Sequence, residues 1–252
     1  MRIQRIGFTP LKGTSHAEHA SVDLAAHGPV GDREFALVDR SHRRVLRTVE
    51  NPRLLACPAT WAGGVLSVGV SGRTLSGTPR PTGETLEFDY WGRSAAVEVV
   101  DGPWAGAFSD LLGRPVALTR VAQPGEVVYG ASISVVTTSS LRLLAETVAH
   151  AVDAARFRST LVIDTDELEP HVEDSWEGRE LRMGSAIIRI QGAIDRCAVI
   201  DADPATGAPG SRLLRALAGY RLRDTSIDFG AYAEVVTPGV VSRGDLVTVE
   251  PA

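Results

Sequence analysis

The sequence predicts a mainly β protein with inserted helices, in which a β-barrel follows a smaller β-rich N-terminal domain. The 252-residue chain holds 25 Gly, 14 Pro and only 6% aromatic residues. This composition favours many turns and short strands over long helices. Apolar runs are short and bounded by Gly, Pro or Ser, and helical periodicity is confined to a few stretches after residue 103. Many short strands with few helices are typical of a barrel and not of a doubly wound sheet.

The first half contains mostly strand patterns. RIQRIGF (2–8) predicts a strand, and REFALVD followed by RSHRRVLRT predicts a hairpin with a polar turn at Ser41 and His42. GVLSVGV and RTLSG continue the strand pattern. PWAGAFSDLLG (103–113) predicts a short helix that ends at Gly113 and Pro115. We therefore expect a first domain over residues 1–120.

The second half, residues 121–252, begins near the Pro-Gly punctuated stretch 122–132. The clearest helix of the chain follows, because apolar residues recur at three- and four-residue steps from Leu141 to Ala155, and Thr138 or Ser139 can cap its first turn. RSTLVID and SAIIRIQGAI predict strands, and SRLLRALAGY predicts a second helix that ends near Gly219. Residues 230–250, GAYAEVVTPGVVSRGDLVTVE, predict two strands joined by a Pro-Gly turn.

Charge and hydropathy exclude several functional classes. A formal net charge of −5 argues against general nucleic-acid binding, which needs a basic face. We expect no membrane association, because no run of about 18 apolar residues is present and the N-terminus lacks a signal-peptide pattern. We therefore expect a cytoplasmic protein in which Cys57 and Cys197 remain free thiols.

Cys197 is the first candidate for chemistry. It directly follows Arg196 at the end of an apolar strand, and a neighbouring positive charge favours the thiolate, the form that binds metals. The following residues, DPATG (203–207), are typical of a turn. The alternative is that Cys197 is a small buried hydrophobe, as isolated cysteines often are. No HExxH motif, paired cysteines or histidine cluster predicts a zinc site instead.

Other segments carry groups suited to anion binding. They contain Lys12 in TPLKGTS, Arg33 in PVGDREF, Thr137 and Thr138 in VVTTSSL, and Arg158 in ARFRSTLVI. The Thr/Ser run lies at a predicted helix N-terminus, where free amides and the helix dipole attract anions. Each also has a plainer interpretation as a solvated charge, an ion pair or a helix cap. No standard phosphate loop is present, so the residues alone indicate a possible anion pocket with a thiol.

Taken together, these segments resemble the MOSC family with its N-terminal MOSC-associated β-barrel domain, whose best-known members are the mitochondrial amidoxime-reducing components and their bacterial relatives. The resemblance covers nearly the whole chain. In the first half it rests on TPLKGTS, GPVGDREFALVD and ENPRL. In the second half it rests on ARFRSTLVI, EDSWEGRELRMG, DRCAVIDADPATG, LLRALAGYR, FGAYAEVVTPG and VSRGDLV.

The resemblance implies a molybdenum cofactor (molybdenum-molybdopterin). Cys197 would supply the protein thiolate to the metal, a sensible soft ligand. The residues that fall in segments holding the pterin and its phosphate in the family are Lys12, Arg33, Thr137, Thr138, Arg158 and Arg196. Tyr232 is expected near the site as packing. The chain departs from the reductase pattern at Gly13, at Ser159 and Thr160, and at Asp195, which places a negative charge near the metal.

The implied activity is an oxidoreductase that reduces small N-hydroxylated or N-oxide substrates by oxygen-atom transfer. Two cysteines are too few for an Fe–S cluster, and no dinucleotide fingerprint is present. A separate electron donor, a ferredoxin-like protein or a flavin or Fe–S reductase, is therefore expected. The chief rival is a sulfur or cofactor carrier that uses Cys197 without redox turnover, independent of the pyridoxal phosphate domain found in full-length cofactor sulfurases. A third possibility is a non-metal biosynthetic enzyme built on the same barrel.

Overall fold

A computed structural model describes residues 1–250, apart from the side chain of Asp89. These residues form several sheets and three α-helices, α1 (Trp104–Leu112), α2 (Thr138–Val148) and α3 (Leu213–Arg221). The prediction of a mainly β fold with inserted helices is confirmed. No helix in residues 1–250 is both long and apolar enough to cross a lipid bilayer.

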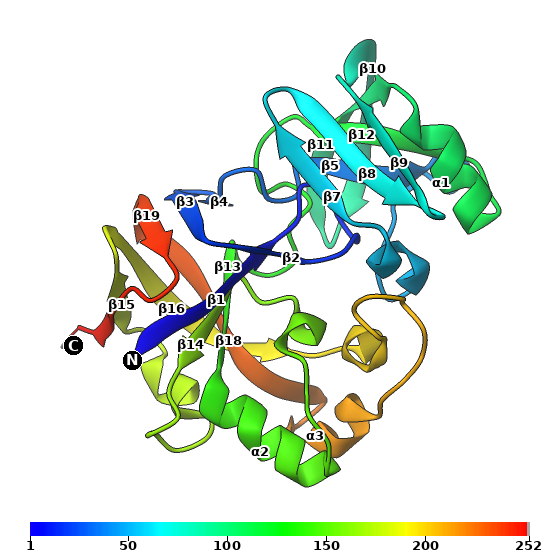
Figure 1. Cartoon of the computed structure of the whole chain (residues 1–252). Coiled ribbons are helices and arrows are strands. Elements are labelled where there is room, and N and C mark those ends of the chain that lie inside the picture. Colours follow the sequence, from blue (N-terminus) through cyan, green and yellow to red (C-terminus); the bar gives the residue numbers. More distant parts are fainter. Residues whose placement is uncertain (251–252) are drawn as a thin grey trace.

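The large lobe is built around a nine-stranded sheet with the order β2-β1-β14-β13-β18-β16-β15-β20, and β17 pairs with β18. Its strands are β1 (Arg2–Phe8), β2 (Ala17–His19), β13 (Ile133–Thr137), β14 (Leu161–Asp164), β15 (Glu180–Met183), β16 (Ala186–Asp195), β17 (Leu222–Arg223), β18 (Ser226–Thr237) and β20 (Val247–Val249). Beside it lies the small sheet β19 (Gly239–Ser242), β3 (Ser21–Ala25) and β4 (Gly28–Pro29). Figure 1 shows α2 and α3 below this lobe and the two ends of the chain close together.

Hydrogen bonds connect β1, the second strand in this order, to the segment around β20, the last strand. The Ile3 amide donates to the Asp245 carbonyl over 3.0 Å, and the Val247 amide donates to the Met1 carbonyl over 3.0 Å. These bonds connect the start of β1 to the segment that enters β20, so the sheet curves back on itself. A continuous apolar core that includes Ile6, Val135 and Ile188 fills the lobe. Such a core is expected because the side chains along each strand of a curved sheet alternate between its interior and its exterior.

The small lobe holds two sheets. One has the order β10 (Arg80–Tyr90), β11 (Arg93–Asp101), β12 (Val116–Val121), β5 (Phe35–Asp39) and β6 (Arg44–Val45), and the other consists of β7 (Ala59–Ala62), β8 (Val65–Val70) and β9 (Arg73–Gly77). Helix α1 buries Trp104 and Phe108 against this core and ends at Gly113, which adopts φ 67° as the sequence predicts. In Figure 1 this lobe lies at the upper right, above the large lobe.

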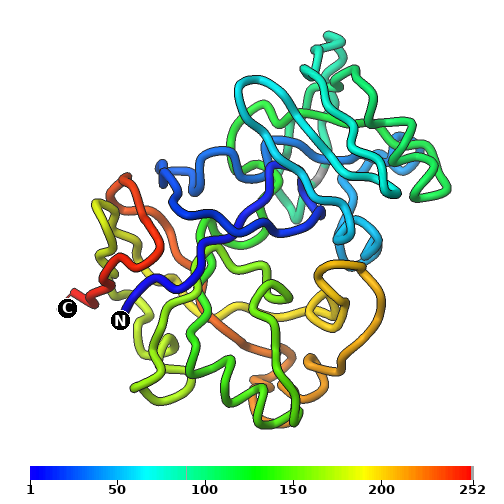
Figure 2. The backbone as a smooth tube through the Cα atoms, in the orientation of Figure 1, coloured from blue at the N-terminus to red at the C-terminus, as the bar shows by residue number. Residues whose placement is uncertain are grey.

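The first strands of the chain belong to the large lobe, which the expected boundary at residues 120 and 121 does not anticipate. β1 pairs with β14, and β3 pairs with β19. Between β1 and β2 the chain enters the small lobe, where Leu11 is fully buried and forms a bridge with Phe35. The tube in Figure 2 shows the dark blue N-terminal segment running from the lower sheet toward the small lobe.

One helix differs from its prediction. The apolar periodicity predicts a helix to Ala155, but α2 ends at Val148, and Ala149 adopts a left-handed φ of 57°. A short 3₁₀ turn, η2 (Ala154–Phe157), follows. Val152 and Ala154 still pack against the core that Leu144 enters. The periodicity therefore continues past the end of the helix because the following loop covers the same apolar surface.

The close pairing of β13 with β18 depends on Gly230. Its φ is +76°, and a Cβ there would lie 2.4 Å from the Val135 carbonyl oxygen. Both the left-handed backbone and the close contact exclude a side chain. By contrast, Gly219 in α3 is exposed, and a Cβ there would meet no atom within 4 Å.

We expect Gly230→Ala to destabilise the protein by about 1–3 kcal/mol, because it adds backbone strain and a steric overlap. Gly219→Ala is the matched control and should stabilise the protein by about 0.5–1 kcal/mol, as Ala does within a helix. Urea unfolding of both variants measures the two changes. Equal effects on the free energy of unfolding would show that Gly230 is not constrained as described.

Candidate functional site

A pocket of about 410 Å³ lies between the two lobes. It brings together five of the residues that the sequence predicts: Lys12, Arg33, Arg158, Arg196 and Cys197. The same pocket is lined by Tyr232 and by three positions at which the chain departs from the reductase pattern, Gly13, Thr160 and Asp195. Residues from both halves of the chain therefore form one concave site, the usual setting for a ligand.

Cys197 lies at the pocket because β16 ends two residues before it. The Arg196 amide donates to the Ile227 carbonyl over 2.9 Å, and Cys197 then begins the 3₁₀ turn η4 (Ala198–Asp201). Its thiol is free and exposed, so the alternative of a buried small hydrophobe does not hold. Cys57 is free but buried, and burial raises the pKa of its thiol to about 11. Cys197 is therefore the thiol accessible to a ligand.

Arg196 is partly buried and joins three segments of the chain next to this thiol. Its Nε donates to the Phe229 carbonyl over 2.7 Å, and its Nη1 donates to the Phe157 carbonyl over 2.9 Å. The guanidinium also lies 5.2 Å from the centre of the Phe157 ring. Its Nη2 is buried and finds no hydrogen-bond partner among the described residues. Burial lowers the pKa of Arg196 to about 10, so the side chain stays charged at neutral pH.

Lys12 is the only lysine in the sequence, and its side chain lines the pocket. The backbone of its segment is fixed, because the Lys12 amide donates to the Phe35 carbonyl over 2.8 Å and the Thr14 hydroxyl donates to the Leu11 carbonyl over 2.6 Å. The ammonium lies 5.0 Å from the centre of the Tyr90 ring. Burial, with the charges of Arg33 and Arg158, lowers the pKa of Lys12 to about 7.

Arg33 and Arg158 both adopt left-handed backbone conformations, with φ values of 50° and 51°. Arg33 pairs with Asp32 over 2.8 Å. Arg158, in the large lobe, donates from Nη1 to the Thr14 carbonyl over 2.7 Å and so contacts the loop that enters the small lobe. Burial and the Arg33 charge lower the pKa of Arg158 to about 9. The pocket thus brings several cations together. A bound anion would offset their mutual repulsion and the cost of their desolvation.

Thr137 and Thr138 do not line this pocket. The Thr137 hydroxyl donates to the Glu173 carboxylate over 2.7 Å, and the Thr138 hydroxyl accepts from the Thr165 amide over 2.9 Å. Glu173 is fully buried, burial raises the pKa of its carboxyl group, and Ser140 also donates to it. The sequence predicts a bound anion near the start of α2, but the carboxylate of Glu173 lies there instead.

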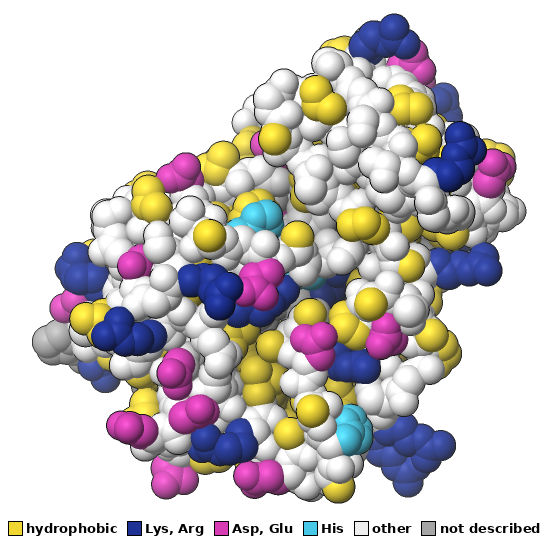
Figure 3. All heavy atoms as spheres, in the orientation of Figure 1, with side chains coloured by type: hydrophobic (Ala, Val, Ile, Leu, Met, Phe, Trp, Pro, Cys, Tyr) yellow, Lys and Arg dark blue, Asp and Glu magenta, His cyan; other side chains and the backbone are white. Residues whose placement is uncertain are grey.

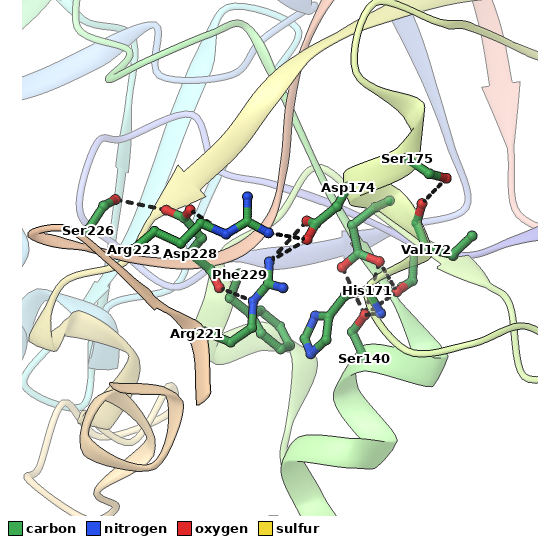
Figure 4. Close-up of polar contacts among 12 residues, drawn as sticks. Ser140, His171, Val172, Asp174, Ser175, Arg221, Arg223, Ser226, Asp228 and Phe229 are labelled. Carbon is green, nitrogen blue, oxygen red and sulfur yellow. Dashed lines mark hydrogen bonds and ion pairs between the residues drawn. The ribbon is translucent and has the colours of Figure 1, made fainter. Parts of the chain in front are cut away.

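A network of polar side chains lies next to the buried Glu173, beside the start of α2. Figure 4 shows His171 beside Ser140, with Arg221 between Asp174 and the chain at Asp228. The Arg221 guanidinium pairs with Asp174 over 2.8 Å and donates to the Asp228 carbonyl over 2.8 Å. These contacts join α3, β18 and the 3₁₀ turn η3 (Val172–Trp176). We interpret the network as structural, because it fixes the helices beneath the sheet.

The pocket is also lined by residues for which the sequence gives no prediction, among them Arg47, Trp91 and Tyr129, which are exposed, and Tyr90, which is buried. Trp91 and Gly92 form the two-residue turn between β10 and β11. A bulky residue at this turn position, where Asn or Gly is usual, is a signal that sequence inspection can use. Asp195 also lines the pocket, and its carboxylate accepts from the Ile227 amide over 2.9 Å.

Within residues 1–250, no three His, Cys, Asp or Glu side chains come together as a metal-binding group. The face drawn in Figure 3 carries basic and acidic side chains side by side, without a patch of a single sign. The concentration of positive charge is therefore a property of the pocket and not of this whole face.

Comparison with known proteins identifies the second half of the chain. Residues 124–248 match the MOSC domain. No curated protein matches the sequence significantly. The YuaD protein from Bacillus subtilis is structurally similar over 98% of this chain and 93% of its own, with a TM-score of 0.48 and 11% identity. YiiM from Geobacillus stearothermophilus is similar over 48% of this chain and 54% of its own, with a TM-score of 0.35 and 16% identity.

We expect the Lys12 ammonium to titrate near pH 7 in the ligand-free protein. Protein labelled with ¹³C-lysine gives a single ε-carbon resonance for Lys12, whose pH midpoint can be measured by NMR. Arg33→Gln should raise the midpoint, because it removes a like charge, and inorganic phosphate should raise it for the same electrostatic reason. Arg243→Gln is the control, because Arg243 is exposed, pairs with Glu18 and does not line the pocket. A midpoint near 10.5 in every sample would contradict the described burial.

Proposed function

Residues 124–248 are a MOSC domain, and from this premise we propose that the protein binds a molybdenum cofactor in the interlobe pocket and reduces small N-oxygenated compounds. The observation that carries the proposal is the accessible Cys197 thiol in a pocket lined by Lys12, Arg33, Arg158 and Arg196. A thiolate is a suitable ligand for a soft metal. The cations suit the phosphate of a pterin cofactor.

The residues present fit this cofactor in charge. Lys12 and Arg158 have lowered pKa values because they are buried beside other cations. Arg196 has a buried Nη2 that no described residue accepts from. A dianionic phosphate would offset these costs, since buried charges are stabilised by partners of opposite sign. We do not include Thr137 and Thr138 in the proposed cofactor site, because their hydroxyls are bonded within the protein.

Each pocket residue then has a distinct role. Cys197 would ligate the metal, and Arg196 holds the segment before Cys197 against β18 through the Phe229 carbonyl. Lys12, Arg33 and Arg158 bind the anionic part of the cofactor. When bound, the cofactor supplies the two-electron removal of an oxygen atom from the substrate. Tyr232, whose pKa burial raises to about 12, keeps its proton at neutral pH and can donate a hydrogen bond in the pocket.

The net reaction balances with an external reductant. The N–O bond of the substrate breaks, two electrons and two protons enter, and the oxygen leaves as water, so that an amidoxime becomes an amidine. We propose that a separate ferredoxin-like, flavin or Fe–S protein supplies the electrons, because two cysteines are too few to hold an Fe–S cluster.

A carrier function is the second candidate, and the exposure of Cys197 supports it. An accessible thiol can hold a persulfide as well as a metal. In that case the domain would transfer sulfur or cofactor without redox turnover. Metal analysis and mass spectrometry of the purified protein separate the two functions: about one molybdenum per chain supports the reductase, and a persulfide on Cys197 without metal supports the carrier.

We expect Cys197→Ser to abolish molybdenum-linked absorbance and the reduction of amidoximes by reduced viologen, while circular dichroism shows an intact fold. The exposed thiol has no packing role, whereas it completes the proposed metal site. Cys57→Ala is the control: it removes a buried thiol, so it lowers stability but should retain molybdenum. Full molybdenum content in Cys197→Ser would remove the central claim.

Arg158→Gln should speed the loss of cofactor on dialysis by about tenfold or more, because a hydrogen bond to a charged group contributes about 1.5–3 kcal/mol. Arg142→Gln is the matched control, since Arg142 lies on the exposed face of α2 and pairs with Asp166. Thermal unfolding of each variant measures any separate effect of losing the Thr14 contact. Equal retention of molybdenum in both variants would exclude Arg158 from the cofactor site.

A further inference from the structure

Arg47, Trp91 and Tyr129 lie at the mouth of the pocket and have no part in the proposed binding of the cofactor. We call these three residues the aromatic mouth. Trp91 is 50% exposed and Tyr129 is 47% exposed, and their ring centres lie 4.7 Å apart with an angle of 55° between the ring planes. Two large aromatic rings that remain half exposed at a pocket present an apolar surface to a ligand.

The backbone of Trp91 indicates that this exposure is not incidental. Trp91 and Gly92 connect β10 to β11, and their φ values are 56° and 77°. Positive φ at both central positions favours Asn-Gly, and a bulky residue in this region is a genuine outlier. Because Trp91 is half exposed, burial of its ring does not fully offset the strain. Strained residues of this kind cluster at ligand-binding sites.

Arg47 stacks on this indole. Its Cζ lies 4.2 Å from the centre of the Trp91 ring. Its nearest ionic partner is Glu50 at 3.9 Å, and the other oxygen of Glu50 pairs with Arg44 at 3.2 Å. In the described part of the chain, the Arg47 guanidinium makes no shorter contact with an acceptor. A guanidinium that lies over an aromatic ring can keep N–H groups available, and two of these groups match the two oxygens of a carboxylate.

We propose that the aromatic mouth binds flat aromatic acids, so that the preferred substrates are N-oxygenated aromatic compounds that carry a carboxylate. The carboxylate accepts from the Arg47 edge, and the ring lies against Trp91 and Tyr129. The N-oxygenated group is then directed inward, toward the part of the pocket that Cys197 lines. The choice of N-oxygenated compounds rests on the proposed function, whereas the binding of an aromatic acid rests on these three residues alone.

The cationic pocket favours the same class of substrate. Lys12, Arg33 and Arg158 line the same pocket and are less exposed than Arg47. The phosphate of a bound cofactor would neutralise these three cations, whereas the exposed Arg47 would keep its charge at the mouth of the pocket. A substrate anion is therefore attracted to the mouth and oriented there, while an uncharged ring gains only the stacking contact.

Binding to the metal-free protein tests the mouth without any enzymatic activity. Isothermal titration with benzoate, benzamide and cyclohexanecarboxylate separates the contribution of the charge from that of the flat ring. We expect benzoate to bind at least about tenfold more tightly than either analogue, the scale of one charged hydrogen-bond pair. Arg47→Gln should abolish the preference for benzoate over benzamide. Trp91→Gly, which suits the turn conformation and so preserves the hairpin, should abolish the preference for benzoate over cyclohexanecarboxylate.

Arg44→Gln is the matched control, because Arg44 pairs with the same Glu50 but does not line the pocket. It should leave all three affinities within about twofold, as expected for an exposed ion pair. Benzoate binding that Arg47→Gln does not weaken would place the acid on the other cations of the pocket and overturn the proposal. Equal binding of benzoate and cyclohexanecarboxylate would overturn the role of the rings.

Turnover of the cofactor-loaded protein tests the substrate class. With reduced viologen, 4-carboxybenzamidoxime should have a kcat/KM at least about tenfold above that of benzamidoxime, and acetamidoxime should be the poorest of the three. In Arg47→Gln the ratio of the first two values should fall to about one. Loss of molybdenum from Arg47→Gln would assign Arg47 to the cofactor instead and overturn the proposal. Selective benzoate binding without turnover of any amidoxime would contradict the proposed function but leave the mouth intact.

Discussion

The central constraint in this structure is the confinement of like charges between two lobes. Lys12 and Arg33 come from segments at the edge of the small lobe, and Arg158 and Arg196 come from the large lobe. Backbone carbonyls of Thr14, Phe157 and Phe229 accept from the arginines and hold them in place. These bonds offset only part of the desolvation cost, so the pKa values of Lys12 and Arg158 remain lowered, and a bound anion would stabilise the charged forms of both side chains.

The strands and the short helix before Gly113 could be predicted because local patterns determine them. Alternation in residues 65–70 and the Gly at the helix end were sufficient. The end of α2 could not be predicted, since the residues after Val148 remain apolar for a reason of packing and not of helical geometry. The position of β1 beside β14 was also beyond local patterns, because their pairing joins residues more than 150 apart in the sequence.

Part of the candidate site could be predicted from the sequence, as was true of the fold. The motif segments, through their resemblance to a family, pointed to five residues that the structure gathers in one pocket. The helix N-terminus at Thr137 looked equally suited to an anion, but Glu173 lies there instead. Nothing in the local sequence around Thr137 reveals a carboxylate 36 positions later. Trp91 carries a local signal, its bulk at a tight turn, but its pairing with Arg47 could not be predicted, because that contact forms only when two hairpins meet.

The loop between β1 and β2 has a consequence for how the pocket fills. Leu11 inserts into the core of the small lobe while the strands on either side of it remain in the large lobe. The close approach of Gly207 to Pro52 adds a second junction between the lobes. We expect two lobes joined at two places to move apart less readily about a single hinge than the lobes of clamshell proteins do. A large ligand would then enter a largely preformed cavity through its opening, beside the β10–β11 turn that carries Trp91.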